Sequence, residues 1–379
     1  MFSESDHLFM QRALKLAALG RFTTSPNPNV GAVVVKDGVI VGEGYHQQAG
    51  GPHAEVFALR QAAEKAKGAT CYVTLEPCSH YGRTPPCALA LIDAGVRRVV
   101  LAMTDPNPQV SGRGIALLQN AGIEVASGLL ENEARALNPG FLHKMLYQLP
   151  YVQLKLAASL DGRTALKNGV SKWLTGPEAR LDVQHLRAQS CAILSTAETV
   201  LCDDALLNVR APDITSLKNG SMRQPLRIIL DRLCRLTGQE PLFLQGGDII
   251  LLHQAQAREN DSWPLLQLPE STLLKVQRHA LALAADGRFD LKAVIAFIAT
   301  LPVNMLWVEA GAKLASSLWQ QQLVDELVLY QAPVLLGPDA RPMLEFAELT
   351  EMNQAPRLNW FDIQQFGADL RLRAKVKGQ

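Results

Sequence analysis

The segment from His53 to Cys87 limits what this chain can fold into more than any other part of the sequence. It contains a His53-Ala-Glu55 tripeptide and, further on, Cys78 and Cys87, each preceded by a proline. One imidazole and two thiolates can supply three ligands to a zinc ion and leave the fourth tetrahedral position open for water. The fold must then bring three separate positions together. Glu55 is the candidate for proton transfer, because that task needs a carboxylate that does not bind the metal.

The pattern around these residues places them at the ends of regular elements. Residues 53–66 are predicted to form a helix that begins after a proline, and residues 70–75 a strand that ends just before Cys78. Cys87 is expected to open a further helix. Two helix N-termini would then point at the metal, and their positive ends favour thiolate over thiol.

The metal motif leaves alternatives open. His80 could be a fourth ligand and close a purely structural zinc site, and two cysteines in a reduced protein are often just small buried hydrophobic residues. However, a His-x-Glu motif followed by Pro-Cys and a second cysteine is the pattern of zinc-dependent nucleobase deaminases. The order of these residues here favours a catalytic zinc over a structural one.

Length and composition favour a two-domain enzyme of the cytoplasm. A chain of 379 residues is too long for one ordinary core, and its hydrophobic content of 48% is typical of folded proteins. The net charge is +1 and no basic stripe is present, so we expect neither a nucleic-acid partner nor a membrane surface. The six cysteines are too scattered for a disulfide framework, and the polar N-terminus contains no apolar signal region.

The first part of the chain is predicted to form a mixed sheet covered by helices. An amphipathic helix is expected at 6–19 with Ser5 as its N-cap, and Asp37-Gly38 between the apolar runs 30–36 and 39–45 indicates a hairpin. After Cys87, helices and strands alternate, which implies parallel pairing. Further elements are expected at 88–94, 97–103, 115–121, 123–126 and, as one helix, around 131–146.

Two longer stretches resemble the bifunctional riboflavin-biosynthesis deaminase/reductase family. The first is His-Ala-Glu followed by Thr-Leu-Glu-Pro-Cys-Ser-His-Tyr-Gly-Arg-Thr-Pro-Pro-Cys, with eight residues between its cysteines instead of the two of the short deaminase pattern. The second begins at Lys155-Leu-Ala-Ala-Ser-Leu-Asp-Gly162 and includes Leu306-Trp-Val-Glu-Ala-Gly311. The resemblance implies an α/β fold, with an N-terminal cytidine-deaminase-like three-layer domain over 1–147 and a C-terminal dihydrofolate-reductase-like domain over 148–379.

The resemblance also implies roles for individual residues. The first domain would use Zn²⁺ to deaminate 2,5-diamino-6-(5-phosphoribosylamino)pyrimidin-4(3H)-one, and the second would use NADPH to reduce the ribosyl group. Zinc would bind to His53, Cys78 and Cys87, and the catalytic residues would be Glu55, Lys155 and Glu309. The expected cofactor-binding residues are Ala157, Trp173, Thr199, Asp203 and Gly311. The expected substrate-binding residues are Asn27, His46, Asn107, Ser171, Arg187, Leu207 and Arg210. A homodimer through the second domain is expected as well.

The residues of the second domain give less direct support for its reductase activity. A lysine inside an apolar strand is costly unless paired, and composition alone favours an edge position for Lys155 over a working one. No complete G-x-G-x-x-G accompanies the turn after Glu309. Cys191, Ser195 and Ala205 depart from the Asp, Gly and Pro that are usual in the family. A second domain that binds nucleotide without reducing anything, and a non-catalytic zinc protein, therefore remain as alternatives.

Overall fold

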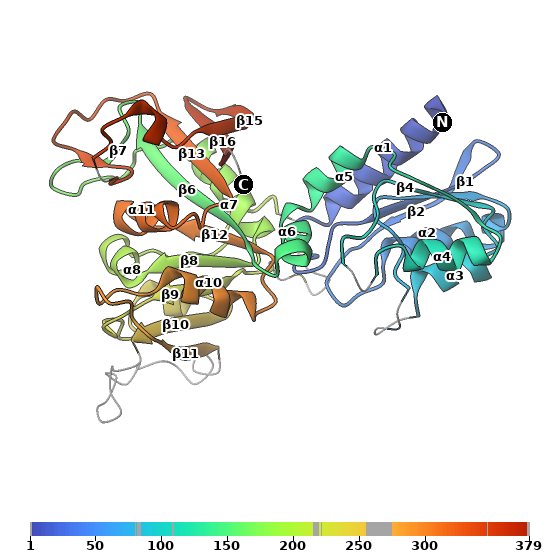
Figure 1. Cartoon of the computed structure of the whole chain (residues 1–379), viewed down its shortest axis with the longest axis horizontal. Coiled ribbons are helices and arrows are strands. Elements are labelled where there is room, and N and C mark those ends of the chain that lie inside the picture. Colours follow the sequence, from blue (N-terminus) through green and yellow to red (C-terminus); the bar gives the residue numbers. More distant parts are fainter. Residues whose placement is uncertain are drawn as a thin grey trace. The chain divides into compact units, whose positions relative to one another are not determined.

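The chain forms two compact units (Figure 1), one over Met1–Gln148 and the other over Leu149–Ile214 with Met222–Gln379. The computed structural model describes residues 2–79, 81, 85–107, 110–214, 220, 222–254, 275–346 and 348–376. Each unit has a hydrophobic core on both faces of its own sheet. Within the described residues, no helix has the length and apolar character needed to cross a membrane.

The first unit is built on a five-stranded sheet with the order β2-β1-β3-β4-β5. Its strands are β1 (Gly31–Lys36), β2 (Val39–Tyr45), β3 (Thr70–Val73), β4 (Arg98–Leu101) and β5 (Glu124–Ser127). β1 pairs antiparallel with β2 and β3, whereas β3, β4 and β5 are parallel. Asp37 and Gly38 both have positive φ, as a tight hairpin turn requires. The mixed sheet therefore follows the prediction.

Helices cover both faces of this sheet. They are α1 (Glu4–Leu19), α2 (Ala54–Ala62), α3 (Cys87–Asp93), α4 (Arg113–Asn120), α5 (Glu131–Leu137) and α6 (Pro139–Tyr147), with a 3₁₀ turn η1 (Ala63–Ala66). α2, α3 and α4 pack on one face, and α1, α5 and α6 contribute to the core on the other. The result is a three-layer arrangement in which the N-termini of α2 and α3 lie beside the end of β3.

Two details predicted from the sequence are wrong. Ser3, not Ser5, caps α1, because its hydroxyl accepts from the amide of Asp6 while the Asp6 carboxylate accepts from the Ser3 amide. The single helix expected around 131–146 is two helices. Pro139 starts α6, and a proline disfavours helical backbone in the residue before it, so the pattern cannot continue through that point.

The second unit contains a nine-stranded sheet with the order β11-β10-β9-β8-β12-β6-β13-β16-β15. Its strands are β6 (Tyr151–Ser159), β8 (Ala192–Thr196), β9 (Leu226–Leu230), β10 (Ile249–Gln254), β11 (Val276–Leu281), β12 (Met305–Glu309), β13 (Glu326–Ala332), β15 (Leu358–Phe366) and β16 (Asp369–Val376). In this spatial order, every neighbouring pair of strands from β11 across to β13 is parallel. β16 and β15 extend the sheet beyond β13 as an antiparallel hairpin. The short strands β7 (Arg163–Ala165) and β14 (Arg341–Pro342) pair separately.

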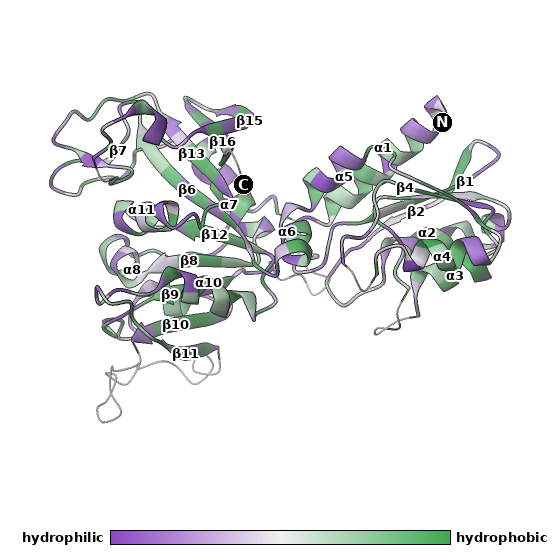
Figure 2. Ribbon diagram, in the orientation of Figure 1, coloured by the Kyte–Doolittle hydropathy of each residue, from purple (hydrophilic) through white to green (hydrophobic). Residues whose placement is uncertain are grey.

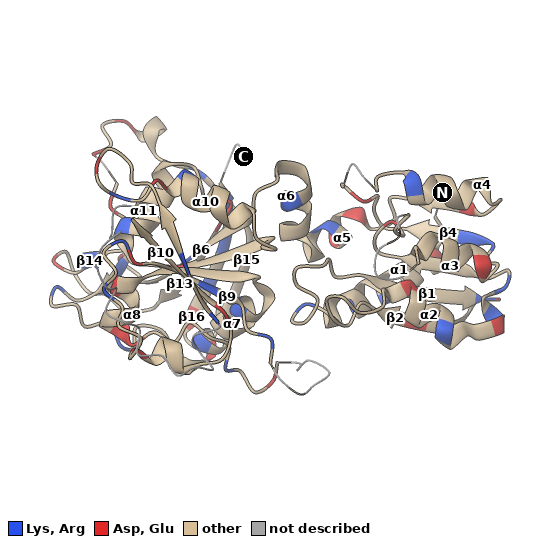
Figure 3. Ribbon diagram, turned by 90° about the horizontal axis from the view of Figure 1, so that it is seen from below, with Lys and Arg blue, Asp and Glu red and all other residues tan. Residues whose placement is uncertain are grey.

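Parallel strands buried on both faces should be largely apolar, and Figure 2 shows β10 mostly green. β9 is also apolar except for the fully buried Arg227. The covering helices are α7 (Pro177–Gln189), α8 (Ala197–Asp203), α10 (Leu291–Ala299) and α11 (Ala312–Gln320), with 3₁₀ turns η2 (Pro241–Leu244) and η3 (Met352–Gln354). α10 and α11 pack on one face, and α7 and α8 on the other. Lysines, arginines and acids are interspersed along the ribbons of both units (Figure 3).

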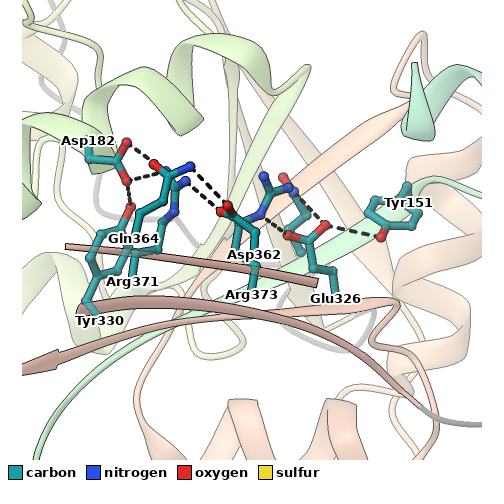
Figure 4. Close-up of polar contacts among 9 residues, drawn as sticks. Tyr151, Asp182, Glu326, Tyr330, Asp362, Gln364, Arg371 and Arg373 are labelled. Carbon is teal, nitrogen blue, oxygen red and sulfur yellow. Dashed lines mark hydrogen bonds and ion pairs between the residues drawn. The ribbon is translucent and has the colours of Figure 1, made fainter. Parts of the chain in front are cut away.

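A buried polar network holds α7 against the sheet (Figure 4). The Asp182 carboxylate on α7 accepts from the Tyr330 hydroxyl at 2.6 Å and from Arg371 at 2.7 and 2.8 Å. Asp182 and Arg371 are each only 8% exposed, so losing Arg371 would leave the Asp182 carboxylate buried without a counter-charge, whereas Arg371 also pairs with Asp362. A second carboxylate, Glu326, accepts from Arg373 at 2.6 Å. The network matters for the candidate site described below, because α7 also carries a residue that contacts that site.

Candidate functional site

The three candidate zinc ligands converge in the first unit. His53 is the N-cap of α2, Cys78 lies in the loop after β3, and Cys87 is the first residue of α3. His53 Nδ1 lies 3.3 Å from Cys87 Sγ and 3.6 Å from Cys78 Sγ, and all three ligand atoms are within 4.8 Å of one another. A tetrahedral zinc with ordinary bond lengths keeps its nitrogen and sulfur ligands about 3.6 Å apart. The donor set and its spacing therefore fit one zinc ion.

Within the described residues, the cluster of ligating side chains consists of these three alone. His80, which the sequence offered as a fourth ligand, lies outside the described residues. The described residues thus provide three protein ligands, which is the number found in catalytic zinc sites.

The two thiols shift each other's pKa in opposite directions. The pKa of Cys78 is lowered, because the Cys87 thiol, the His53 ring and the Cys87 backbone amide all hydrogen-bond to its sulfur. The pKa of Cys87 is raised by the same contact with Cys78 and by burial. A divalent cation at this point would favour the thiolate form of both.

Glu55 lies beside the ligands without being one of them. It is 3% exposed, and in the part of the chain that the structure describes its Oε2 atom is buried without a hydrogen-bond partner. Burial raises the pKa of this carboxyl, although the charge of His53 opposes the shift. A buried carboxylate oxygen with no partner needs an explanation, and a group that exchanges protons with a bound substrate or water supplies one.

Two expected substrate residues meet beside the metal ligands. The amide nitrogen of Asn27 lies 3.1 Å from Nε2 of His46, and Nδ1 of His46 lies 3.0 Å from the Pro52 carbonyl oxygen. Because a carbonyl can only accept, Nδ1 carries the proton and Nε2 accepts from Asn27. Burial lowers the pKa of His46, which keeps the ring neutral, and its centroid is 5.5 Å from that of His53. His46 thus fixes the orientation of the Asn27 amide next to the ligand cluster.

In the second unit, Lys155 and Glu309 are paired across neighbouring strands. They are register partners on β6 and β12, and β6 lies between β12 and β13 in the sheet. The edge position that composition favoured for Lys155 is therefore wrong. Burial lowers the pKa of Lys155, while the charge of Glu309 opposes that shift. A central lysine is tolerated here because a carboxylate accompanies it.

Glu309 is held by donors from two elements. Arg187 on α7 binds both carboxylate oxygens, with 2.9 Å from Nη2 to Oε2, and the Trp307 indole nitrogen donates to Oε1 at 2.8 Å. Burial by itself would raise the pKa of Glu309, but Arg187, Lys155 and Trp307 together lower it to about 2. Trp307 is fully buried, and the sequence analysis assigned it no role. The carboxylate is thus ionised and fixed at the end of β12.

The two arginines expected to bind the substrate, whose phosphate a guanidinium suits, differ in their surroundings. Arg187 is 9% exposed and, besides Glu309, donates to the Asn208 carbonyl at 3.0 Å. Arg210 is exposed, and its guanidinium donates to the Asn208 side chain. Arg210 is therefore the more open of the two, and a phosphate contact by Arg187 stays a prediction.

The expected cofactor residues come from several elements of the second unit. Gly311 is the N-cap of α11, directly after β12, where first-turn amides can hold a phosphate. Trp173 is 72% exposed, with the Arg180 guanidinium 4.4 Å from its ring centroid. Thr199 and Asp203 are on α8, and Ala157 is part-buried on β6. Of the expected substrate-binding residues, Ser171 is part-buried before α7 and Leu207 is buried.

The departures from the family pattern are accommodated locally. The Ser195 hydroxyl donates to the Glu309 carbonyl at 2.6 Å, so it fastens the end of β12 that carries the carboxylate. The Cys191 sulfur accepts from the amides of Asn304 and Met305 at 3.3 and 3.4 Å. Ala205 is part-buried and packs against the hydrophobic core that includes residues of α7 and α8. Whether these changes weaken cofactor binding stays a prediction.

Metal content gives a first test of the ligand assignment. We expect purified protein to hold about one zinc ion per chain and Cys87→Ala to lower this strongly, because a three-ligand site that loses a thiolate retains too few donors. Cys71→Ala is the matched control, since Cys71 is a fully buried thiol of the same unit outside the cluster. Equal zinc loss in both variants would contradict the assignment. Elemental analysis after gel filtration provides the measurement.

Comparison with protein-family models gives two matches that together span most of the chain. Residues 150–372 match the RibD C-terminal domain, and residues 3–103 match the cytidine and deoxycytidylate deaminase zinc-binding region. The second match covers His53, Cys78 and Cys87. Both agree with the fold class predicted from the sequence.

Curated relatives and solved structures match over nearly the full length. The riboflavin biosynthesis protein RibD of Escherichia coli K12 is 51% identical over 373 residues, covering 97% of this chain and 98% of the relative. RibD of Haemophilus influenzae is 49% identical, with 100% and 99% covered. A structure of Acinetobacter baumannii RibD superposes with a TM-score of 0.86 at 44% identity, covering 99% of each chain. A Thermotoga maritima diaminohydroxyphosphoribosylaminopyrimidine deaminase/5-amino-6-(5-phosphoribosylamino)uracil reductase gives 0.83 at 32%, covering 98% and 99%.

Proposed function

Because this chain belongs to the RibD family of bifunctional riboflavin-biosynthesis deaminase/reductases, we propose that its first unit is a zinc-dependent hydrolase and its second an NADPH-dependent oxidoreductase. The observation that carries the first half is the convergence of His53, Cys78 and Cys87 beside the partnerless buried oxygen of Glu55. The substrate is the diaminopyrimidine ribose phosphate that the family deaminates, and the product of the first unit is the substrate of the second.

In the first unit, the chain's own residues manage protons and orientation. A zinc ion bound by the three ligands supplies the Lewis acidity that brings the pKa of a water close to neutral. Glu55 would take a proton from that water, and burial, which raises its pKa, favours holding it. Glu55 would deliver this first proton to the ring nitrogen and then carry the second proton of the same water to the departing amine, so that water and the amino group become a carbonyl and ammonia. Asn27, oriented by His46, is placed to bind the amide edge of the pyrimidine.

In the second unit, reduction of a ribosyl to a ribityl group adds one hydride and one proton. NADPH supplies the hydride when bound, and the protein supplies binding, orientation and charge. Lys155 is our candidate proton donor, because burial lowers its pKa and Glu309 keeps a negative charge beside it. Arg210 suits the substrate phosphate, since a guanidinium matches phosphate oxygens in pairs. Trp173 and Gly311 are assigned to the cofactor.

The activity of the second unit is tested by NADPH oxidation with the deaminated pyrimidine as substrate. We expect turnover by the wild type and a loss of about a hundredfold or more in Lys155→Met, since removal of a general acid has effects of this order. Lys292→Met is the control, because Lys292 is exposed on α10, away from the site strands. Absorbance at the NADPH band gives the rate.

Two outcomes of that assay would change the proposal. Normal turnover by Lys155→Met would remove Lys155 from the mechanism. No turnover by the wild type would leave a deaminase whose second unit binds nucleotide without reducing it.

The expected homodimer and the cytoplasmic location also stay predictions. Light scattering on purified protein would test the homodimer.

A further inference from the structure

Glu76 is a buried carboxylate with an unusual set of partners. It lies between β3 and the metal ligand Cys78 and is 3% exposed. Its Oε2 atom accepts from the backbone amides of Asp105 and Gly112 at 3.2 and 3.1 Å. Its Oε1 atom accepts from the amides of Gly114 and Ile115 at 3.0 and 3.3 Å. All four donors belong to the segment that joins β4 to the first turn of α4.

The carboxylate replaces the cap that α4 lacks. Gly112, the N-cap of α4, has no side chain to accept from the first-turn amides, and its φ is +75°. Glu76 supplies that acceptor from another part of the chain, and its negative charge lies at the positive end of the helix. The approach is close, because a Cβ on Gly114 would lie 2.1 Å from the Pro77 carbonyl oxygen. The loop is thus packed directly onto the corner that leads to Cys78.

The contacts of Glu76 are also linked to Asn107, an expected substrate-binding residue. The amide of Asp105 is held by Glu76, and the Asp105 carboxylate accepts from the amide of Asn107 at 2.8 Å. The carbonyl of Asn107 in turn accepts from Val110 and Ser111, each at 2.8 Å. The backbone position of Asn107 therefore depends on a chain of bonds that starts at Glu76, two residues from a metal ligand.

We propose that Glu76 is a positioning residue of the deaminase, whose carboxylate fixes the loop carrying Asn107 at a set distance from the metal ligands. The inference rests on the proposed function of the first unit. Glu76 touches neither substrate nor metal in this assignment. It acts through the loop, so its loss should weaken substrate binding while proton transfer by Glu55 and metal binding continue.

Glu76→Gln is the sharpest variant, because it preserves size and removes one acceptor. Each carboxylate oxygen serves two amides, so either orientation of the glutamine amide leaves two of the four without an acceptor. We expect the KM for the diaminopyrimidine substrate to rise about tenfold or more, with kcat changed by less than about threefold and zinc content unchanged. The backbone amides of Asp105, Asn107 and residues 110–115 should exchange their hydrogens faster, which a hydrogen-exchange measurement without substrate would record.

Controls separate positioning from general damage. Asp6→Asn alters another buried carboxylate of the same unit, whose partners are Ser3, Tyr72 and Arg98, and should lower stability without raising KM. NADPH oxidation by the second unit of each variant reports on the integrity of the rest of the chain.

Three results would overturn the role of Glu76. They are an unchanged KM with unchanged exchange, an equal rise of KM in Asp6→Asn, and zinc loss with unchanged exchange in the loop. If the wild type itself released no ammonia, the proposed function would fail, whereas the exchange data would still test whether Glu76 holds the loop.

Discussion

Replacing Glu55 with glutamine is expected to lower the rate of ammonia release by about a thousandfold while zinc stays bound. Glutamine keeps the size of the side chain but cannot take up a proton, and general acid–base groups contribute about 10² to 10⁴ in rate. Glu55 is not among the ligand atoms, so the metal site itself should be unaffected. Ammonia release from the diaminopyrimidine substrate, measured together with zinc per chain, gives both quantities in one preparation.

The matched control is Glu64→Gln. Glu64 is an exposed carboxylate in η1, just after α2, and its replacement should leave both ammonia release and zinc unchanged. If Glu55→Gln released ammonia at the wild-type rate, Glu55 would have no part in the mechanism. If neither the wild type nor any variant released ammonia although zinc was bound, the metal would be a structural staple, as the non-catalytic alternative holds.

Replacing Arg187 with methionine is expected to destabilise the second unit by about 3–5 kcal/mol and to abolish NADPH oxidation. The Arg187 and Glu309 side chains are 11% and 13% exposed, so methionine would leave a nearly buried carboxylate without its main counter-charge. Adding Glu309→Gln to Arg187→Met should restore part of the stability but not the activity, because the buried carboxylate that lost its main counter-charge is then gone. Lys155 loses its carboxylate neighbour in this variant, but burial already lowers its pKa and so favours the neutral amine.

This effect should depend on pH with a defined sign. The pKa of Glu309 is lowered to about 2 in the folded chain, against about 4.3 for an unperturbed glutamate. The stability from ionised Glu309 is therefore fully present above about pH 4.3 and is lost as the pH falls towards 2. The difference between wild type and Arg187→Met should shrink over that window.

Tryptophan fluorescence can follow the second unit alone. All five tryptophans of the chain come after residue 149, so urea unfolding monitored at their emission reports on that unit. Arg288→Met, which alters an exposed arginine, serves as the control. A single variant as stable as the wild type, or a double variant no better than the single, would contradict the role assigned to the ion pair.

The parts of the fold and site that the sequence predicted are those that local chemistry determines. Asp37-Gly38 indicates a hairpin because few other pairs accept positive φ at both positions, and the structure has that hairpin. The spacing of His53, Cys78 and Cys87 indicates a metal site, since three such donors rarely converge without one. Alternating helices and strands imply parallel pairing, which β3, β4 and β5 show.

What the sequence did not reveal depends on partners far away along the chain. Lys155 appeared costly inside a strand, because its counter-charge Glu309 becomes a neighbour only through the register of β6 and β12. Trp307 is an exception, because it was assigned no role although its partner Glu309 is only two residues further along the same strand.

Glu76 was seen only as part of a motif before Pro-Cys, because its four donors come from the later segment that opens α4. The one available signal was an acidic residue at a strand end together with Gly112-Arg-Gly114, a helix start that has no capping side chain of its own. Neither half of that pair is specific without the fold.

We expect one chain to remove an amino group and then to reduce the product. This is tested by mixing purified protein with the diaminopyrimidine ribose phosphate and NADPH and following ammonia and NADPH together. About one ammonia should be released and about one NADPH consumed per substrate, with ammonia released first and NADPH consumed only after it. NADPH consumption without prior ammonia release, or ammonia release that is never followed by NADPH consumption, would contradict this expectation.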